Sequence, residues 1–141
     1  MLGKPTMRGN SDLLQRFFGS AFLTAAMGPD AAQPAILDLE LQLAQQPSGF
    51  SFKYIAADRA GSWFGRTLKE KRLSLGTISR MYTVASFMPD VEKLPDGIAA
   101  KDLAAEYGKQ TDPRFVNKLR EIDRLVTILP GYRTTAAIFG R

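Results

Sequence analysis

Three polar side chains with helical spacing lie near residue 115. Arg114, Asn117 and Lys118 are three and four positions apart, so on a helix they would share one face. Arginine, asparagine and lysine donate hydrogen bonds to phosphate oxygens and to the edges of bases. Lys109 and Arg120 flank this set and would hold neighbouring phosphates. The set therefore indicates contact with a nucleic acid.

A second cationic stretch occupies residues 66–80. Its basic residues are Arg66, Lys69, Lys71, Arg72 and Arg80, and its one acid is Glu70. Such a stretch either neutralises phosphates without reading base sequence or forms a solvated basic surface. Trp63 and Phe64 would stack on bases if they were exposed, although aromatic residues of this kind more often belong to a core. The sequence leaves both alternatives open.

Catalytic and metal-binding chemistry has little support. The chain contains no histidine and no cysteine, which excludes imidazole and thiolate ligands, disulfides, histidine bases and cysteine nucleophiles. It has no Gly-x-Ser-x-Gly motif and no Walker-type phosphate loop. Asp38 and Glu40 alternate along a predicted strand, where a solvated face explains them better than an acid–base pair. We therefore expect no enzyme, no catalytic residue, no cofactor and no metal.

The overall charge favours a polyanionic partner. The 141 residues carry a net charge of +5, and residues 53–81 hold seven Lys and Arg against Asp58 and Glu70. The sequence pI is 9.7. No apolar run approaches the ~20 residues that cross a membrane, so we expect no membrane partner. A cytoplasmic or virion-associated protein fits these properties.

The first half of the chain changes its periodicity. Ser11 can cap a helix over 12–27, whose apolar residues Leu14, Phe17, Phe18, Ala21, Phe22 and Ala25 form one stripe, and Gly28-Pro29 would end it. Leucines then alternate with polar residues from Leu37 to Leu43, and aromatic residues alternate from Phe50 to Tyr54. Period two predicts a β-hairpin over 36–56, although leucine, glutamate and glutamine individually prefer helices.

The second half is predicted to be mainly helical. We expect helices over 77–88, 98–107 and 113–125, preceded by a loop or short helix over 57–66 and a polar helical turn over 67–72. A terminal hairpin over 125–139 would turn at Pro130-Gly131, since Pro followed by Gly suits a type II turn. We expect residues 1–60 to form an N-terminal interaction or oligomerisation arm, and residues 61–141 to form a helical domain.

Residues 100–119 have the features of two helices joined by a tight turn. Gly108 is the turn glycine, and Asp112 and Pro113 are a good N-cap and first residue for the second helix. The inward apolar positions are Leu103, Tyr107, Val116 and Leu119, with the small residue Ala104 where the helices would cross. The pattern predicts either a DNA-reading unit or a structural helical hairpin.

Residues 77–139 resemble the winged helix-turn-helix superfamily. The segments 77–88, 98–108 and 112–125 correspond to its three helices, and 126–139 corresponds to its wing. The resemblance implies that Arg114, Asn117 and Lys118 enter the major groove, and that Tyr132 and Arg133 contact the DNA from the wing tip. The expected fold is thus α+β, a helical core with an N-terminal amphipathic helix, a β-hairpin near 36–56 and a C-terminal winged-helix-like unit.

Two functional hypotheses follow. The first is a duplex-DNA-binding regulator or packaging factor of a phage, plasmid or bacterium, with Arg114, Asn117, Lys118, Lys109, Arg120, Arg133, Arg66, Lys69, Arg72 and Arg80 as contact residues. The second is a structural or assembly subunit, such as a virion protein that forms homo-oligomers or larger complexes through its N-terminal aromatic residues. An uncovered cationic ridge from Asp112 onward favours the first. Carboxylates paired with Arg114 and Lys118 favour the second.

Overall fold

Seven helices account for most of the described chain. The computed structural model describes residues 6–71, 74–81 and 83–133. In chain order the helices are α1 (Ser11–Met27), α2 (Pro29–Leu43), α3 (Phe52–Lys69), α4 (Leu75–Met81), α5 (Val84–Phe87), α6 (Ala100–Tyr107) and α7 (Pro113–Thr127). In these ranges there is no sheet, and backbone pairing outside helices is confined to isolated bridges, Met7 with Asn10 and Phe50 with Ile98.

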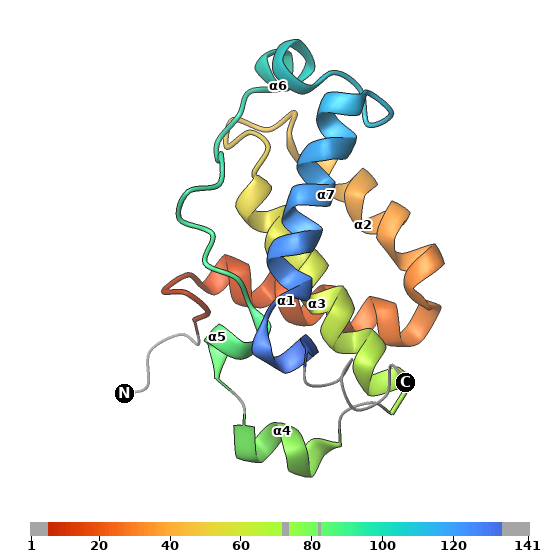
Figure 1. Cartoon of the computed structure of the whole chain (residues 1–141). Coiled ribbons are helices and arrows are strands. Elements are labelled where there is room, and N and C mark those ends of the chain that lie inside the picture. Colours follow the sequence, from red (N-terminus) through yellow and green to blue (C-terminus); the bar gives the residue numbers. More distant parts are fainter. Residues whose placement is uncertain (1–5, 72–73, 82, 134–141) are drawn as a thin grey trace.

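Helix α3 is the central element. It contacts α1 and α2 on one side and α7 on the other, while α6 and α4 lie at opposite ends of the molecule (Figure 1). Ring contacts pair Phe52 with Phe115 and Trp63 with Tyr132, so α7 and the residues after it follow α3 in the same direction. Helix α3 also runs without interruption through residues 60 and 61, where the sequence suggested a division of the chain.

Helices α1 and α3 cross with their backbones in contact. A Cβ atom at Gly61 would overlap the carbonyl of Phe17, and one at Gly65 would overlap the carbonyl of Ala21. These two contacts advance by four residues on both helices, so α1 and α3 run in the same direction. The C-terminal turns of α1 and α3 therefore lie next to each other.

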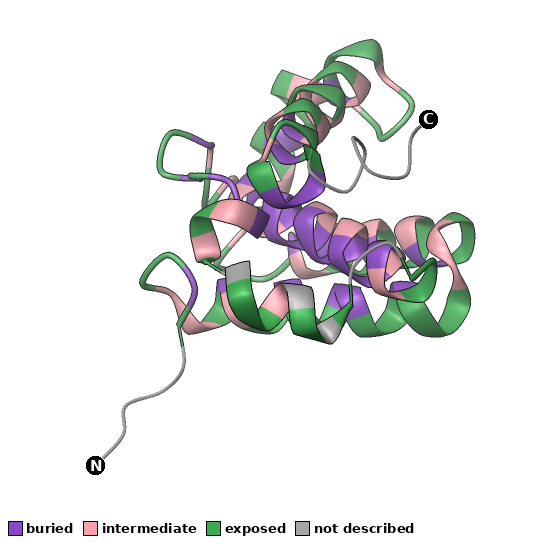
Figure 2. Ribbon diagram, turned by 60° about the horizontal axis from the view of Figure 1, so that its bottom comes forward, coloured by how far each residue is buried: buried purple, intermediate pink, exposed green. Residues whose placement is uncertain are grey.

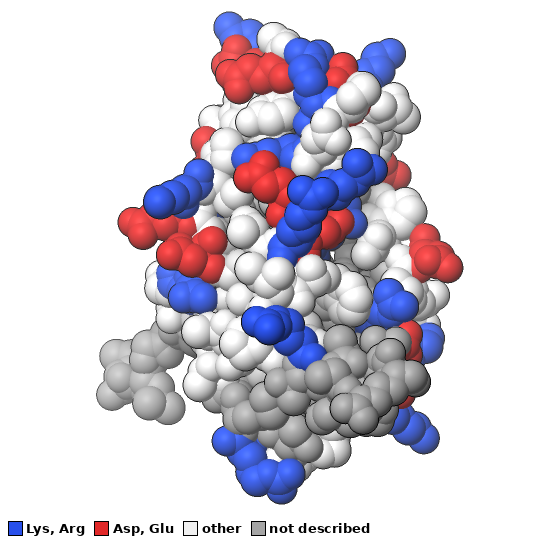
Figure 3. Space-filling view, viewed as in Figure 1, with Lys and Arg blue, Asp and Glu red and all other residues white. Residues whose placement is uncertain are grey.

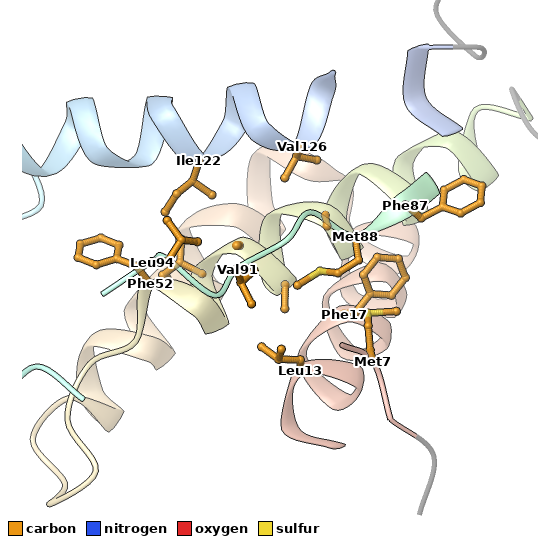
Figure 4. Close-up of a cluster of buried hydrophobic side chains, with 14 of the residues drawn as sticks. Met7, Leu13, Phe17, Phe52, Phe87, Met88, Val91, Leu94, Ile122 and Val126 are labelled. Atoms are coloured by element: carbon orange, nitrogen blue, oxygen red, sulfur yellow. The ribbon is translucent and has the colours of Figure 1, made fainter. Parts of the chain in front are cut away.

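The core lies where α1, α3, α7 and the segment after α5 meet. In Figure 4, Leu13 and Phe17 of α1 lie on one side of the segment that contains Met88, and Ile122 and Val126 of α7 point toward that segment from the other side. All five side chains are at most 2% exposed. Figure 2 shows the same arrangement over the whole chain, with buried residues where the helices face each other and exposed residues on their outer sides.

The predicted hairpin over 36–56 is wrong. Residues 36–43 belong to α2, and residues 52–56 are the first turns of α3. The alternating leucines are distributed around a helix, since Leu37 and Leu41 pack against the core while Leu39 is 51% exposed. Helix propensity prevailed over the period-two pattern because a helix satisfies its own backbone groups without a partner strand.

The predicted terminal hairpin over 125–139, which was to supply the wing, is also wrong in the residues that the structure describes. Residues 125–127 complete α7, and residues 130–133 form a helical turn that contains Pro130 and Gly131. Residues 134–139 lie outside the described residues. With neither hairpin present, the described chain is all-α rather than α+β, and its C-terminal part has no wing.

Several predicted helices are confirmed, with adjusted ends. Helix α1 matches the prediction over 12–27, but its cap is Asn10, whose Oδ1 accepts from the backbone N–H of Asp12 at 2.7 Å. Helices α6 and α7 match the predictions over 98–107 and 113–125, and Asp112 caps α7 through the Arg114 N–H at 2.8 Å. The helix predicted over 77–88 is instead divided into α4 and α5. The stretch predicted to be a loop or short helix belongs to the 18-residue α3.

Candidate functional site

The turn between α6 and α7 has the backbone that its sequence predicted. Gly108 adopts φ 73°, and the Asp112 side chain occupies the space where a Cβ atom at Gly108 would lie. Leu103 is buried, and the Tyr107 ring packs on Phe52 with 4.9 Å between centroids. The two helices are thus joined by a turn that requires glycine, and the end of α6 packs on the start of α3.

Arg114, the first predicted base-reading residue, is held by its neighbours. Its guanidinium binds both carboxylate oxygens of Asp112, with Nε 3.1 Å from Oδ1 and Nη2 3.0 Å from Oδ2. A further hydrogen bond of 3.0 Å runs from Nη1 to the Ala105 carbonyl. These side-chain hydrogen bonds lower the pKa of Asp112 and raise that of Arg114. The charge of Arg114 is therefore paired, and its fork is oriented toward α6.

Lys118, the second predicted base-reading residue, lies along the protein surface. Its Nζ is 3.3 Å from Glu121 Oε2 and 6.0 Å from the centroid of the Phe52 ring. Only 19% of the Lys118 side chain is exposed, because its stem covers apolar surface and its ammonium group meets a carboxylate. Arg114 and Lys118 are thus both paired with carboxylates, and the Arg114 side chain is still 55% exposed whereas that of Lys118 is mostly covered.

The other predicted contact residues fall into two groups. Lys109, Asn117 and Arg120 are exposed near the junction of α6 and α7. Lys69, Arg80 and Arg133 are exposed toward the opposite end of the molecule, near the end of α3 and around α4. Arg72 lies outside the described residues. Since α3 rises about 1.5 Å per residue over its 18 residues, the two groups belong to different surfaces.

The second group lies in the most basic part of the chain. On the face shown in Figure 3, the charged side chains visible at the lower end of the molecule are mainly Lys and Arg, whereas most acidic side chains lie higher. Arg66 pairs with Glu70 at 3.0 Å and lies over the Trp63 ring at 5.2 Å. Phe64 is 6% exposed and belongs to the core. Trp63 and Phe64 are thus occupied by protein contacts rather than open for base stacking.

An exposed apolar surface lies on the outer side of α1, where the sequence pattern predicted one undivided apolar stripe. The predicted single stripe is split in the structure, because Phe17 and Ala21 are buried while Phe18 and Phe22 are exposed. At about 100° per residue, the exposed positions form a continuous arc along the helix. From Gln15 onward this arc consists of Gln15, Phe18, Gly19, Phe22, Leu23, Ala25, Ala26 and Met27. We call these residues the outer face of α1.

The outer face of α1 is unusually apolar for an exposed helix. Phe22 is 72% exposed, Met27 50%, Phe18 43% and Leu23 36%. A helix at a protein surface ordinarily places charged and polar residues on this side, and a helix that is apolar all around is normally covered. None of the described helices is both long enough and apolar enough to cross a bilayer.

A buried polar cluster joins the first three helices. Arg16 Nε of α1 lies 2.8 Å from Glu40 Oε1 of α2, and Ser20 of α1 donates a 2.9 Å hydrogen bond to Asp58 Oδ1 of α3. Glu40 is 3% exposed and Asp58 4%. The sequence indicated Glu40 as a solvated residue and left Asp58 without a role, because their proximity depends on how the helices pack.

Neither a metal-binding cluster nor a similar known protein points to a function. In the described residues, no group of three or more acidic side chains is arranged to hold a metal ion. No protein-family model, curated protein or solved structure matches the chain. The function is therefore inferred from the geometry of the surfaces described above.

Proposed function

We propose that this protein is a structural or assembly subunit that associates with a second copy of itself through the outer face of α1. The single observation that supports this is the exposure of four large apolar side chains on one helix, with Phe22 at 72%. Full burial of such a side chain from water contributes about 1.5–3 kcal/mol, and each of these four would gain the fraction that corresponds to its still exposed surface. Leaving the face in water would forgo this stabilisation.

The composition of the face favours a second copy as the partner. From Phe17 to Pro29 the chain has no charged residue, so two outer faces of α1 meet without facing like charges. A symmetric contact must be complementary to itself, and an uncharged apolar helix face fulfils that condition. Gly19, Ala25 and Ala26 allow the two helices to approach closely, while Phe18 and Phe22 fill the space beside them.

The test is the mass of the protein in solution. We expect light scattering coupled to size-exclusion chromatography to give a dimer or larger species at micromolar concentration. The substitution Phe22→Ser should shift the mass to that of a monomer without changing the far-UV circular dichroism spectrum. Ile128→Ser is the matched control, because Ile128 is 60% exposed but lies beyond the end of α7.

Three outcomes would overturn this proposal. The first is a wild-type protein that remains monomeric at all concentrations. The second is an oligomer that persists in the Phe22→Ser variant, which would place the contact elsewhere. The third is a monomer that binds lipid vesicles through Phe22, which would make a bilayer surface the partner.

Binding of duplex DNA is a second candidate function, supported by the charge distribution. Between Asp58 and Asp90 the one acidic residue is Glu70, and it is already paired with Arg66. Lys69, Arg80 and Arg133 are exposed in this part of the molecule. We therefore propose that the phosphate contacts are made by Lys69, Arg80 and Arg133 rather than by the residues at the start of α7.

A salt titration distinguishes the two positions. Each phosphate contact adds about 0.9 to the slope of log affinity against log salt concentration. We expect the double variant Lys69→Ala/Arg80→Ala to reduce that slope by about 1.8, the value for two phosphate contacts. The double variant Arg114→Ala/Lys118→Ala should leave the slope unchanged. The opposite pattern would return the contact to α7, and absence of binding at low salt would remove this candidate.

A further inference from the structure

The buried cluster between α1, α2 and α3 contains more carboxyl groups than cations. Glu40 and Asp58 both lie in it, and the charged groups that face Asp58 are Glu40 and Arg16. Arg59, the next residue on α3, is directed away, since it contacts Gln33 of α2 at 3.3 Å and Asp123 of α7 at 3.8 Å. One guanidinium thus serves two buried carboxyl groups.

The hydrogen bonds of Asp58 reveal a missing donor. Its Oδ1 accepts from Ser20, but its Oδ2 is buried and receives no hydrogen bond from any N–H or O–H of the described residues. The carboxyl group beside it belongs to Glu40. Two ionised carboxylates both accept hydrogen bonds and repel each other, whereas a single shared proton converts their contact into a hydrogen bond.

The surroundings favour a proton on Asp58. Burial raises the pKa of Asp58 well above its ordinary value, and the negative charge of Glu40 and the hydrogen bond to it raise it further. Ser20 and Arg16 act in the opposite direction. Glu40 is the carboxyl group in contact with Arg16, so it takes the role of the anion. The cluster is then neutral overall, with one ion pair and one carboxylic acid.

We propose that Asp58 and Glu40 form a buried site for one proton, and that this proton holds α2 against α1 and α3. With the proton bound, Asp58 Oδ2 donates to Glu40, and Glu40 pairs with Arg16. When the proton leaves, Asp58 becomes a second buried negative charge without a cationic partner. Water reaches this charge when α2 separates from α1 and α3. This inference does not depend on the proposed assembly function.

Helix α2 is the element best suited to respond. Its N-terminus has no side-chain cap, and Pro34 removes one backbone donor inside the helix. Its buried positions are Ala32, Ile36 and Glu40, so one of the three belongs to the charged cluster. Helices α1 and α3, in contrast, hold each other through direct backbone contact at Gly61 and Gly65.

The sign of the pH effect follows from the direction of the pKa shift. The pKa of Asp58 is higher in the folded chain than in the unfolded chain, so the folded state retains a proton that the unfolded state has lost. The stabilisation is complete below about pH 4 and is lost as the pH rises through the folded-state pKa. In that interval one extra bound proton changes the unfolding constant by up to about tenfold per pH unit.

Urea unfolding at a series of pH values from 5 to 9 tests the proposal. The wild-type midpoint should fall as the pH rises, and Asp58→Asn, which keeps a neutral donor beside Glu40, should remove most of that dependence. Asp38→Asn is the matched control, because Asp38 is an exposed carboxylate on the same helix. Asp123→Asn measures the separate contribution of Asp123, whose pKa is also raised by burial, and should leave the larger part of the dependence in place.

Direct detection of the proton makes the test independent of whether Asp58→Asn folds. The infrared spectrum of the wild-type protein at neutral pH should contain the C=O band of a buried carboxylic acid, and Glu40→Gln should shift that band. A wild-type midpoint that does not change with pH, or an Asp58→Asn variant with the wild-type dependence, overturns the proposal. Absence of the carboxylic acid band at neutral pH also overturns it.

Discussion

Gly61 of α3 lies against the carbonyl group of Phe17 in α1, with no room for a side chain between them. One turn later, Gly65 meets Ala21 in the same way. The two glycines bring the helix backbones together and place Phe17 between α1 and α3, where it is fully buried. This crossing sets which side of α1 is covered and, by exclusion, which side forms its outer face.

The crossing predicts that Gly61→Ala is destabilising although alanine favours helices. The added methyl group must push α1 away from α3, and overpacking of this kind costs about 1–3 kcal/mol. Gly76→Ala is the matched control, because its nearest neighbours are side-chain atoms at 3.8 Å. We expect a lower urea midpoint for Gly61→Ala and an unchanged or higher one for Gly76→Ala. Equal effects of the two substitutions would contradict the crossing.

Tyr132 predicts a second, smaller effect on stability. Its hydroxyl lies 2.7 Å from the carbonyl of Ala60 and 2.8 Å from that of Phe87, so it ties the last described turn to α3 and α5. Tyr132→Phe removes this buried hydrogen bond at a cost of about 0.5–1.5 kcal/mol. Tyr54→Phe should cost less, since the Tyr54 hydroxyl binds Asp12 at the surface. Thermal unfolding of both variants provides the comparison.

Asp112 predicts a pH effect at the acid end of the range. Its pKa is lowered by hydrogen bonds from the side chain and backbone of Arg114. A lowered folded-state pKa gives stabilisation that is present above about pH 4 and is lost as the pH falls through the folded value. Asp112→Ala should make thermal unfolding less sensitive to pH in this interval, whereas Asp102→Asn, on an exposed position of α6, should not.

Leu39 and Leu41 distinguish the helix α2 from the strand that the sequence pattern predicted. On a strand both side chains would face the core, but on α2 Leu39 is 51% exposed while Leu41 packs against the core. We expect Leu39→Glu to change the free energy of unfolding by about 0.5 kcal/mol or less. Leu41→Glu should lower it clearly more, because a charge then enters partly buried surface. Similar losses in both variants would support a strand.

Local chemistry made the α6–α7 unit predictable. Gly108, Asp112 and Pro113 act within a few residues of themselves, so a turn with positive φ, an N-cap and a first helical residue could be identified from the chain alone. The ion pair between Asp112 and Arg114 is equally local, yet the spacing of the basic residues predicted Arg114 as a DNA contact and not as a partner of Asp112. Spacing showed which residues share a face but not which partners they bind.

Contacts between residues far apart in the sequence could not be predicted from the spacing of residue types. The leucine alternation predicted a strand, but whether residues 36–43 have a partner strand depends on the rest of the fold, and here α2 packs on α1 and α3 instead. Asp58 and Glu40 are eighteen residues apart and come from helices with different neighbours. Their proximity, and the excess buried carboxyl group that it creates, appear only once the three helices are assembled.

By itself the sequence determined the positive net charge, the absence of histidine and cysteine chemistry, and the positions of α1, α6 and α7. These depend on composition and on signals between near neighbours. Tertiary structure alone decided that α2 is a helix, that Phe17 is covered while Phe22 is exposed, and that Asp58 lies beside Glu40. Burial and proton affinity are set by what packs against a residue, and distant segments of the chain supply that environment.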